Sequence, residues 1–394
     1  MVIAAEVNES MQKSSLIRKM FEEGAMLKNK FGADNVYDFS IGNPNLTPPP
    51  QFYEALSDTT AACLRIKNHS YMPQPGNPQT RQAVADFVSQ EHGLAVTAED
   101  IFMSAGAAGA LNTIFKALLD PGDEVLSPAP CFVEYGFYAD NYGGTFRTVP
   151  TLDDFTLDLA AMERGITQQT KIVIINSPNN PTGQIYSRES LEALGQLLTA
   201  KETEYGHPIY LISDEPYRKI VYTKDPPPSV LPIHARSIVV TSHSKDLSIP
   251  GERIGYAVLN PQMPSKQDVF NAMCLTARIL GHVNAPAFMQ QVVAKVQGVT
   301  VDVDLYRRKR DLLCEGLASA GYKFNVPPGA FYLFPKSPIP DDLAFTDILK
   351  AQRILVVPGS GFMGPGFFRI SYCVEDQTII NALPGFKKAL EKIK

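Results

Sequence analysis

A lysine, Lys245, lies in a segment rich in hydroxyl groups, glycines and positive charge, residues 242–255. Ser242 and Ser244 precede it and Arg253 follows it. A lysine amine attacks carbonyl groups when its surroundings lower its pKa, and hydroxyl and guanidinium groups together bind phosphate. The segment therefore suggests a Schiff-base lysine beside an anion site, although a lysine among short polar residues is more often a solvated loop residue.

Two more polar motifs directly follow apolar runs that are typical of strands. One is NSPNNPTG at residues 176–183, and the other is SDEPY at residues 213–217. In open α/β sheets, ligands bind in the crevice beyond the carboxyl ends of the strands. We therefore expect one pocket to collect the polar residues of these motifs with the lysine: Asn180, Asp214, Tyr217 and Lys245.

In their order along the chain, the motifs Asn-Pro-Thr-Gly, Asp-x-x-Tyr, Ser-x-Ser-Lys and Gly-x-Arg-x-Gly resemble those of the class I/II aminotransferases of fold type I, the aspartate aminotransferase superfamily. These enzymes use pyridoxal 5′-phosphate, and the resemblance extends along nearly the whole chain. It implies a transferase that moves an amino group from an amino acid to a 2-oxo acid by a ping-pong mechanism. The aspartate/2-oxoglutarate pair is one candidate.

Composition is that of an ordinary globular enzyme. The 394 residues are 44% hydrophobic and 20% charged, with a net charge of −5, which argues against nucleic acid or an anionic membrane as the main partner. The five cysteines are scattered and never spaced Cys-x-x-Cys, so we expect no disulfide framework and no metal site. Without a signal-like or membrane-spanning stretch, we expect the cytoplasm.

Short apolar runs alternate with amphipathic stretches, which is typical of a mostly parallel sheet with helices on both faces. Asn77 followed by Pro78 predicts the start of a helix that continues through residues 81–91. A long amphipathic stretch at 283–320 is interrupted around Gly298. The expected strands lie at 101–103, 124–126, 171–175, 209–212, 237–241, 254–259, 331–334, 353–357 and 367–372.

The resemblance refines this α/β fold. It implies a large domain with a mostly parallel seven-stranded sheet sandwiched by helices, and a smaller α+β domain built from the N- and C-terminal segments. We expect residues 46–290 to form the large, pyridoxal-phosphate-binding domain and residues 1–45 and 291–394 to form the small one. It also implies a homodimer with shared active sites.

The turn at residues 104–110 is made of glycine, alanine and one serine, and it opens a predicted helix. Free N–H groups and the helix dipole favour an anion there, although such a turn is more often only close helix-on-sheet packing. By resemblance, Tyr71 reaches the phosphate from the partner subunit. The same resemblance makes these the other phosphate contacts: Gly106, Ala107, Ala108, Ser242, Ser244 and Arg253.

Asp214 is the candidate partner of the cofactor's ring nitrogen, because a buried carboxylate keeps a pyridine protonated and able to withdraw electrons. A strand-end aspartate could instead cap a helix. Tyr217 and Asn180 can donate hydrogen bonds to the ring's phenolate oxygen. By resemblance Phe132 stacks on the ring, where it would otherwise be an ordinary core residue. Lys245, Asp214 and Tyr217 are the expected catalytic residues.

Arg369 lies in an apolar strand, residues 367–372, where an unpaired guanidinium would be costly. A structural ion pair is one explanation, and the resemblance gives another, a bidentate contact with the substrate's α-carboxylate. Asn180 and Gly42 would complete that substrate site. The resemblance also puts the segment 48–50 near the substrate entrance.

The donor amino acid is less clearly indicated. One bacterial subgroup of aspartate aminotransferases holds the second carboxylate with a lysine in the phosphate turn, where this chain has Ala108. Arg278 lies close to where another subgroup has a partner-subunit arginine for the same purpose. Two other functions share the motifs, a pyridoxal-phosphate-dependent carbon–sulfur β-lyase and a non-catalytic pyridoxal-phosphate-binding sensor. A sensor is usually fused to a basic DNA-binding domain, which we do not find in this sequence.

Overall fold

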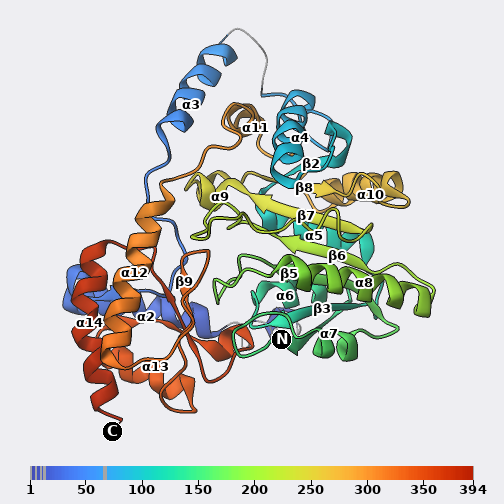
Figure 1. Ribbon diagram of the computed structural model, residues 1–394. Coiled ribbons are helices and arrows are strands. Elements are labelled where there is room, and N and C mark those ends of the chain that lie inside the picture. The colour runs from blue at the N-terminus through green and yellow to red at the C-terminus, as the bar shows by residue number, and fades with distance from the viewer. Residues whose placement is uncertain (1, 5–6, 9–10, 12–14, 65–68, 394) are drawn as a thin grey trace.

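Seven strands from the middle of the chain form one sheet in the order β2-β8-β7-β6-β5-β3-β4. They are seen in a computed structural model that describes residues 2–4, 7–8, 11, 15–64 and 69–393 (Figure 1). The strands are β2 (Ile101–Ser104), β3 (Glu124–Ala129), β4 (Thr145–Pro150), β5 (Thr170–Asn176), β6 (Tyr210–Asp214), β7 (Ser237–Ser242) and β8 (Gly255–Leu259).

Strands β4, β3, β5, β6 and β7 run parallel to one another, while β8 is antiparallel to both β7 and β2. The prediction of a mostly parallel sheet is therefore confirmed. Sequence analysis did not predict β4, whose residues alternate little in polarity and are mostly exposed or half-buried at the sheet edge.

Helices cover both faces of this sheet, as predicted. The side chains of β5 alternate between them, since Ile172 and Ile174 pack with one set of helices and Val173 and Ile175 with the other. The first set is α5 (Gly106–Leu118), α6 (Glu134–Asp140) and α10 (Lys266–Ile279). The second set is α4 (Pro78–His92), α7 (Leu159–Gly165), α8 (Arg188–Tyr205) and α11 (Ala287–Ala294), with α3 (Pro50–Cys63) packed on α11.

Helix α4 begins as its sequence predicts. The Oδ1 atom of Asn77 accepts hydrogen bonds from the N–H groups of Gln79, at 2.9 Å, and Thr80, at 3.3 Å. Pro78 occupies the first helical position, where no N–H donor is needed. Gly93, with φ 64°, ends the helix in the left-handed conformation that glycine adopts without strain.

A second group of elements joins segments from both ends of the sequence. Strand β1 (Tyr37–Asp38) pairs in parallel with β10 (Ile354–Leu355), and an antiparallel sheet has the order β11-β12-β9. Its strands are β9 (Tyr332–Leu333), β11 (Val357–Pro358) and β12 (Phe368–Ser371). The helices are α2 (Ser15–Phe31), α12 (Val303–Ala320), α13 (Asp342–Ala351) and α14 (Asp376–Glu391). Buried aromatic residues, among them Phe39, Tyr306 and Phe386, form its core.

Short helices complete the chain: α9 (His243–Asp246) and the 3₁₀ helices η1 (Ala33–Asn35), η2 (Ala98–Asp100), η3 (Pro250–Glu252) and η4 (Gly359–Phe362). The predicted break around Gly298 is real, because α11 ends at Ala294 and α12 begins at Val303. The domain bounds at residues 45/46 and 290/291 stay predictions, and the residues 1, 5–6, 9–10, 12–14, 65–68 and 394 within them lie outside the described residues. Within the described ranges, every helix is too short or too polar to cross a membrane.

Candidate active site

A cavity of about 420 Å³ opens at the carboxyl ends of β5, β6 and β7. It gathers residues from segments far apart in the sequence. Those among the predicted site residues that line it are Gly42, Ala107, Ala108, Phe132, Asn180, Asp214, Tyr217, Ser242, Ser244, Lys245, Arg253 and Arg369. Gly106 lies beside it, and Tyr71 does not reach the cavity of its own chain.

Lys245 lies on the single turn of α9, directly after β7. Its Nζ atom donates a hydrogen bond to the carbonyl oxygen of Gly42 at 2.8 Å and lies 5.5 Å from the centroid of the Phe331 ring. Burial lowers the pKa of this amine to about 8, the charges of Arg369 and Arg253 act in the same direction, and Cys373 opposes them. Near neutral pH, a larger fraction of this amine is therefore in the neutral, nucleophilic form than for an ordinary lysine.

Asp214, the last residue of β6, is 6% exposed. Its Oδ2 atom accepts a hydrogen bond from the hydroxyl of Tyr135 at 2.6 Å, while its buried Oδ1 atom has no hydrogen-bond partner among the described residues. Burial raises the pKa of this carboxyl to about 7, although the Tyr135 hydrogen bond works against the rise. A buried carboxylate oxygen that faces a cavity without a donor is suited to a cationic N–H group of a ligand.

Arg369 is a buried cation, 6% exposed, on β12. Its Nη1 atom donates to Asn180 Oδ1 at 2.9 Å and its Nη2 atom to the Ser40 carbonyl at 2.7 Å. The guanidinium carbon lies 4.6 Å and 4.5 Å from the ring centroids of Tyr332 and Phe362. None of the ion pairs between described residues includes Arg369, so a structural ion pair does not explain it. The guanidinium is therefore available to a carboxylate in the cavity.

The first turn of α5 is the candidate anion site. Ala105, which precedes the helix, gives no side-chain cap to its free N–H groups. A Cβ atom on Gly106 would lie 2.9 Å from the Arg253 Nη2 atom, so only glycine lets this guanidinium come so close to the helix end. Ser242 and Ser244 line the same cavity. An uncapped helix N-terminus, a guanidinium and two hydroxyls together match a phosphate group.

Sequence analysis missed several residues of this site. Tyr135 was not predicted, although it lies three residues after Phe132 on the turn that opens α6. Tyr332 was expected only as part of a strand, yet its hydroxyl lies 2.7 Å from that of Tyr217. Asn176 was noted only as the start of a motif, but its side chain bonds both the Asn180 N–H, at 2.6 Å, and the Asp214 carbonyl, at 2.7 Å. The remaining unpredicted cavity residues include Glu134, Tyr138 and Phe362.

We expect Gly42→Ala to lower both stability and activity. Its new Cβ atom would overlap the Tyr332 ring and hydroxyl, so Tyr332 must move, which disturbs its hydrogen bond with Tyr217. Overpacking of this kind costs about 1–3 kcal/mol. Thermal unfolding and steady-state kinetics would check this, with Gly136→Ala as the control because its Cβ would meet Phe146 at an ordinary 3.4 Å. A Gly42→Ala protein with unchanged melting temperature and rate would contradict the expectation.

Tyr71 and Arg278 lie on the surface of the chain. Tyr71 is 92% exposed, and Arg278 is exposed near the end of α10, where Leu275 and Ile279 also expose large apolar side chains. The predicted contacts of Tyr71 and Arg278 involve a partner subunit, so both stay predictions.

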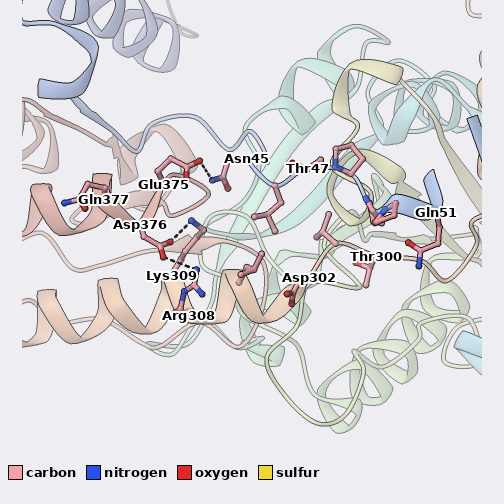
Figure 2. A pocket seen from close by; sticks show the side chains of 16 residues that line it. Asn45, Thr47, Gln51, Thr300, Asp302, Arg308, Lys309, Glu375, Asp376 and Gln377 are labelled. Carbon is pink, nitrogen blue, oxygen red and sulfur yellow. Dashed lines mark hydrogen bonds and ion pairs between the residues drawn. The ribbon is translucent and has the colours of Figure 1, made fainter. Parts of the chain in front are cut away.

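A larger cavity, of about 1010 Å³, lies away from these residues. The segment 48–50, expected near the substrate entrance, lines this cavity and not the smaller one. Figure 2 shows two groups of its polar side chains in contact: Lys309 and Arg308 bind Asp376 at 2.7 and 3.0 Å, and Asn45 donates to Glu375 at 3.2 Å. With these charges already paired, we assign the chemistry to the smaller cavity.

Comparisons with known proteins identify the family and the fold. Residues 34–385 match the family model described as aminotransferase class I and II. The aspartate/prephenate aminotransferase of Thermus thermophilus is 34% identical, over 89% of this chain and 90% of that protein. A crystal structure of an amino transferase from Eubacterium rectale has a TM-score of 0.96 and 39% identity, covering 100% of this chain and 99% of that one. Thermus thermophilus aspartate aminotransferase with maleate has a TM-score of 0.84 and 29% identity, covering 95% and 96% of the two chains.

Proposed function

The chain belongs to the class I and II aminotransferases, and from that premise we propose that its 420 Å³ cavity binds pyridoxal 5′-phosphate. The observation that carries this proposal is the pairing of Lys245 and Asp214 in one cavity. Lys245 offers an amine with a pKa of about 8, and Asp214 offers a buried oxygen without a donor. An aldehyde and a pyridine nitrogen on one molecule would satisfy both.

The residues present fit each part of that cofactor. The first turn of α5, Arg253 and the two serines would hold the phosphate. Asp214 would hold a proton on the ring nitrogen, with Tyr135 fixing its other oxygen. Phe132 would lie against the ring, and the hydroxyl of Tyr217, with its Tyr332 partner, would face the phenolate oxygen. Apart from Tyr135 and Tyr332, these assignments follow the residues predicted from sequence.

When bound, pyridoxal 5′-phosphate supplies an aldehyde for amines and a protonated ring that withdraws electrons from the substrate's α-carbon. Arg369 orients the amino acid by its α-carboxylate, with Asn180 holding the guanidinium in place. The Lys245 Nζ atom removes the α-proton and later returns a proton. Asp214 keeps the ring nitrogen protonated throughout. The amino donor leaves as a 2-oxo acid before the acceptor 2-oxo acid enters, so the kinetics are ping-pong.

The donor we propose is a dicarboxylic amino acid such as aspartate, with 2-oxoglutarate as acceptor. The relatives named aspartate aminotransferases support this. Among the described residues that line the cavity, the cations are Lys245, Arg253 and Arg369, and each already has a role. A second substrate carboxylate therefore needs a cation from outside, and Arg278 of a partner subunit is our candidate.

We expect Arg278→Ala to impair aspartate and glutamate but not alanine. A charge-assisted hydrogen bond contributes about 1.5–3 kcal/mol, so kcat/KM for aspartate should fall by about tenfold or more. Arg188→Ala, which removes an arginine from the exposed start of α8, is the control. Equal losses for alanine and aspartate would remove Arg278 from this role.

We further propose that the enzyme is a homodimer of the cytoplasm. Exposed Tyr71, Leu275 and Ile279 support an interface, and five free cysteines suit a reducing compartment. Sedimentation equilibrium would test the dimer.

Single-turnover spectroscopy tests the function itself. Pyridoxal-loaded protein is mixed with a panel of amino acids, with no 2-oxo acid present. Loss of the cofactor's visible band, with one equivalent of 2-oxo acid released, supports transamination, and the fastest donor identifies the substrate. Catalytic accumulation of pyruvate and ammonia would instead indicate the carbon–sulfur β-lyase.

A further inference from the structure

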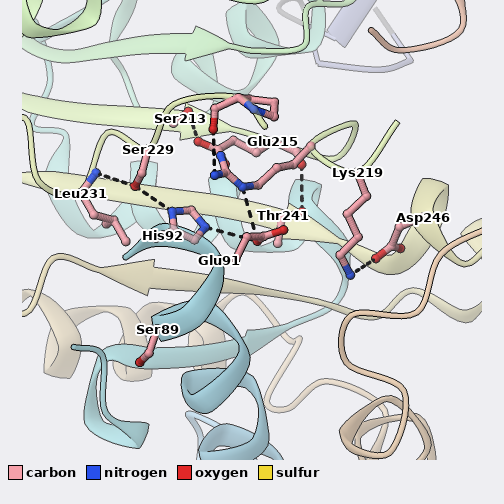
Figure 3. A network of polar contacts seen from close by, with 12 residues as sticks. Ser89, Glu91, His92, Ser213, Glu215, Lys219, Ser229, Leu231, Thr241 and Asp246 are labelled. Carbon is pink, nitrogen blue, oxygen red and sulfur yellow. Dashed lines mark hydrogen bonds and ion pairs between the residues drawn. The ribbon is translucent and has the colours of Figure 1, made fainter. Parts of the chain in front are cut away.

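The residues that follow Asp214, Tyr217 and Lys245 in the sequence turn to the rear of the site. Glu215, Arg218 and Asp246 line a different, very small cavity and do not line the 420 Å³ one. Figure 3 shows the buried polar network that they join, in two separate halves, one around Glu215 and the other formed by Lys219 and Asp246. Each of the three residues Asp214, Tyr217 and Lys245 is therefore followed in the sequence by a polar residue that lies behind the 420 Å³ cavity.

One half of this network joins β6 to helix α4. The Arg218 Nη1 atom binds Glu215 at 2.9 Å and its Nε atom lies 3.3 Å from Glu91. Ser213 donates to the other oxygen of Glu215 at 2.6 Å. This half fixes the segment that carries Asp214 and Tyr217, and it leaves α9 untouched.

The other half centres on Asp246, whose side chain is 8% exposed. Its Oδ2 atom accepts a hydrogen bond from Lys219 at 3.0 Å and lies 3.1 Å from His243 Nδ1, while Oδ1 accepts from the Leu247 N–H at 2.8 Å. Burial alone would raise the pKa of this carboxyl, but the charges and hydrogen bonds of Lys219 and His243 hold it at about 2. Asp246 is therefore a fixed negative charge with both oxygens bound.

The backbone of Asp246 is held as well. Its carbonyl oxygen accepts hydrogen bonds from the Val301 N–H at 2.7 Å and from the Thr300 hydroxyl at 3.2 Å. These two residues belong to the segment that leads into α12. Asp246 thus joins the turn behind the cavity to the chain segment between α11 and α12.

Helix α9 needs such support, because it has only four residues, His243–Asp246. One turn gains about one hydrogen bond for the several dihedral angles it fixes, so it is not stable alone. Without external contacts the direction of the Lys245 side chain would be poorly defined. The contacts of the Asp246 side chain and carbonyl oxygen hold this turn in place.

We propose that Asp246, held by Lys219 and His243, is a positioning residue that fixes α9 so that the Lys245 Nζ atom faces the reacting carbon. This rests on the proposed function, in which Lys245 moves the α-proton. Lys219 lies two residues after Tyr217 in the sequence. Its contact with Asp246 therefore also fixes the position of Lys245 relative to Tyr217 on the other side of the cavity.

The test uses Asp246→Asn, which keeps the shape and removes the charge. We expect kcat to fall by up to about 100-fold, the cost of a misplacement of about 1 Å, with KM for the amino acid within about twofold because Arg369 is untouched. The kinetic isotope effect with α-deuterated donor should rise, because proton transfer becomes slower than the other steps. Asp100→Asn is the control, since it breaks another buried aspartate–lysine pair, with Lys266, at neither cavity.

A second measurement uses protein freed of cofactor. The visible band that forms with pyridoxal 5′-phosphate should appear at least about tenfold more slowly in Asp246→Asn. Pyridoxine 5′-phosphate, which has no aldehyde, should bind as it does to the unaltered protein, because the phosphate contacts are intact.

An unchanged rate of band formation and an unchanged isotope effect in Asp246→Asn would overturn the proposal. So would an equal loss of pyridoxine 5′-phosphate binding, which would indicate a general structural role. If Asp246→Asn does not fold, Lys219→Met decides: a slower band with unchanged pyridoxine 5′-phosphate binding supports the proposal, and wild-type behaviour overturns it. Unaltered protein that forms the band but does not transaminate would contradict the proposed function alone.

Discussion

Lys245→Ala is expected to reduce transamination by up to about 10⁴-fold. The variant loses the amine that attacks the cofactor and the only lysine that lines the cavity among the described residues. The first turn of α5 and Arg253 would still bind the phosphate. The variant should therefore retain the cofactor but lack the visible band of the lysine-bound form. Absorption spectra and single-turnover rates measure the two effects separately.

The pH dependence of cofactor attachment gives a second test of the same residue. Only the neutral amine attacks the aldehyde, and burial holds the pKa of Lys245 at about 8. In cofactor-free protein, the rate of attachment should therefore rise as the pH increases toward about 8 and level off above it. A rate that keeps rising to the range of an ordinary lysine, or a Lys245→Ala protein that still forms the visible band, would contradict our assignment. Lys295→Ala, on the partly exposed end of α11, is the control.

Asp214→Asn is expected to lower kcat by about 100- to 1000-fold, because an amide cannot hold the ring nitrogen in its protonated state through charge pairing. The same substitution should make the cofactor-free protein more stable at pH 8. Asp214 is buried, and its unpartnered oxygen is costly once the carboxyl ionises. The expected result is a variant that melts higher and turns over more slowly.

The sign of this effect follows from the pKa values. The carboxyl has a pKa of about 7 in the folded chain against an ordinary 3.8, so its contribution to stability is full below about pH 4 and is lost as the pH rises through 7. The advantage of Asp214→Asn should grow over that range, to at most about 4 kcal/mol. Melting temperatures between pH 4 and 8 measure it. A variant that melts below wild type at pH 8 without cofactor would contradict the account, and saturation with pyridoxal 5′-phosphate should reverse the order.

Much of the fold could be predicted from sequence because its strands are buried on both faces. Residues 172–175 are uniformly apolar, and this run forms the centre of β5. Strand β4 could not be predicted, because an edge strand needs only one buried side and Thr145 and Arg147 are polar. The strands expected at 331–334 and 367–372 are shorter in the structure, the one expected at 353–357 is divided into β10 and β11, and β1 was not predicted. Their pairing partners, such as β1 and β10, come from opposite ends of the sequence, and no local pattern fixes where such pairing ends.

The candidate site was predictable where a residue's own chemistry indicates its role. A lysine among serines and an arginine in an apolar strand both stand out in a sequence. Tyr135 and Tyr332 do not, because a tyrosine in an apolar segment is usually a core residue. Only packing reveals that one hydroxyl meets Asp214 and the other meets Tyr217.

The pairing of β1 with β10 has a consequence for synthesis on the ribosome. Tyr37 and Asp38 leave the ribosome long before Ile354 and Leu355, their partners in the sheet. At typical translation rates the interval is on the order of tens of seconds, during which Phe39 lacks the core neighbours that are made last, such as Ile370 and Phe386. The strands of the large sheet, all between residues 101 and 259, can pair within that time. The segment at residues 37–39 therefore stays without its sheet partner until translation is nearly complete, and its pairing is among the last contacts of the fold to form.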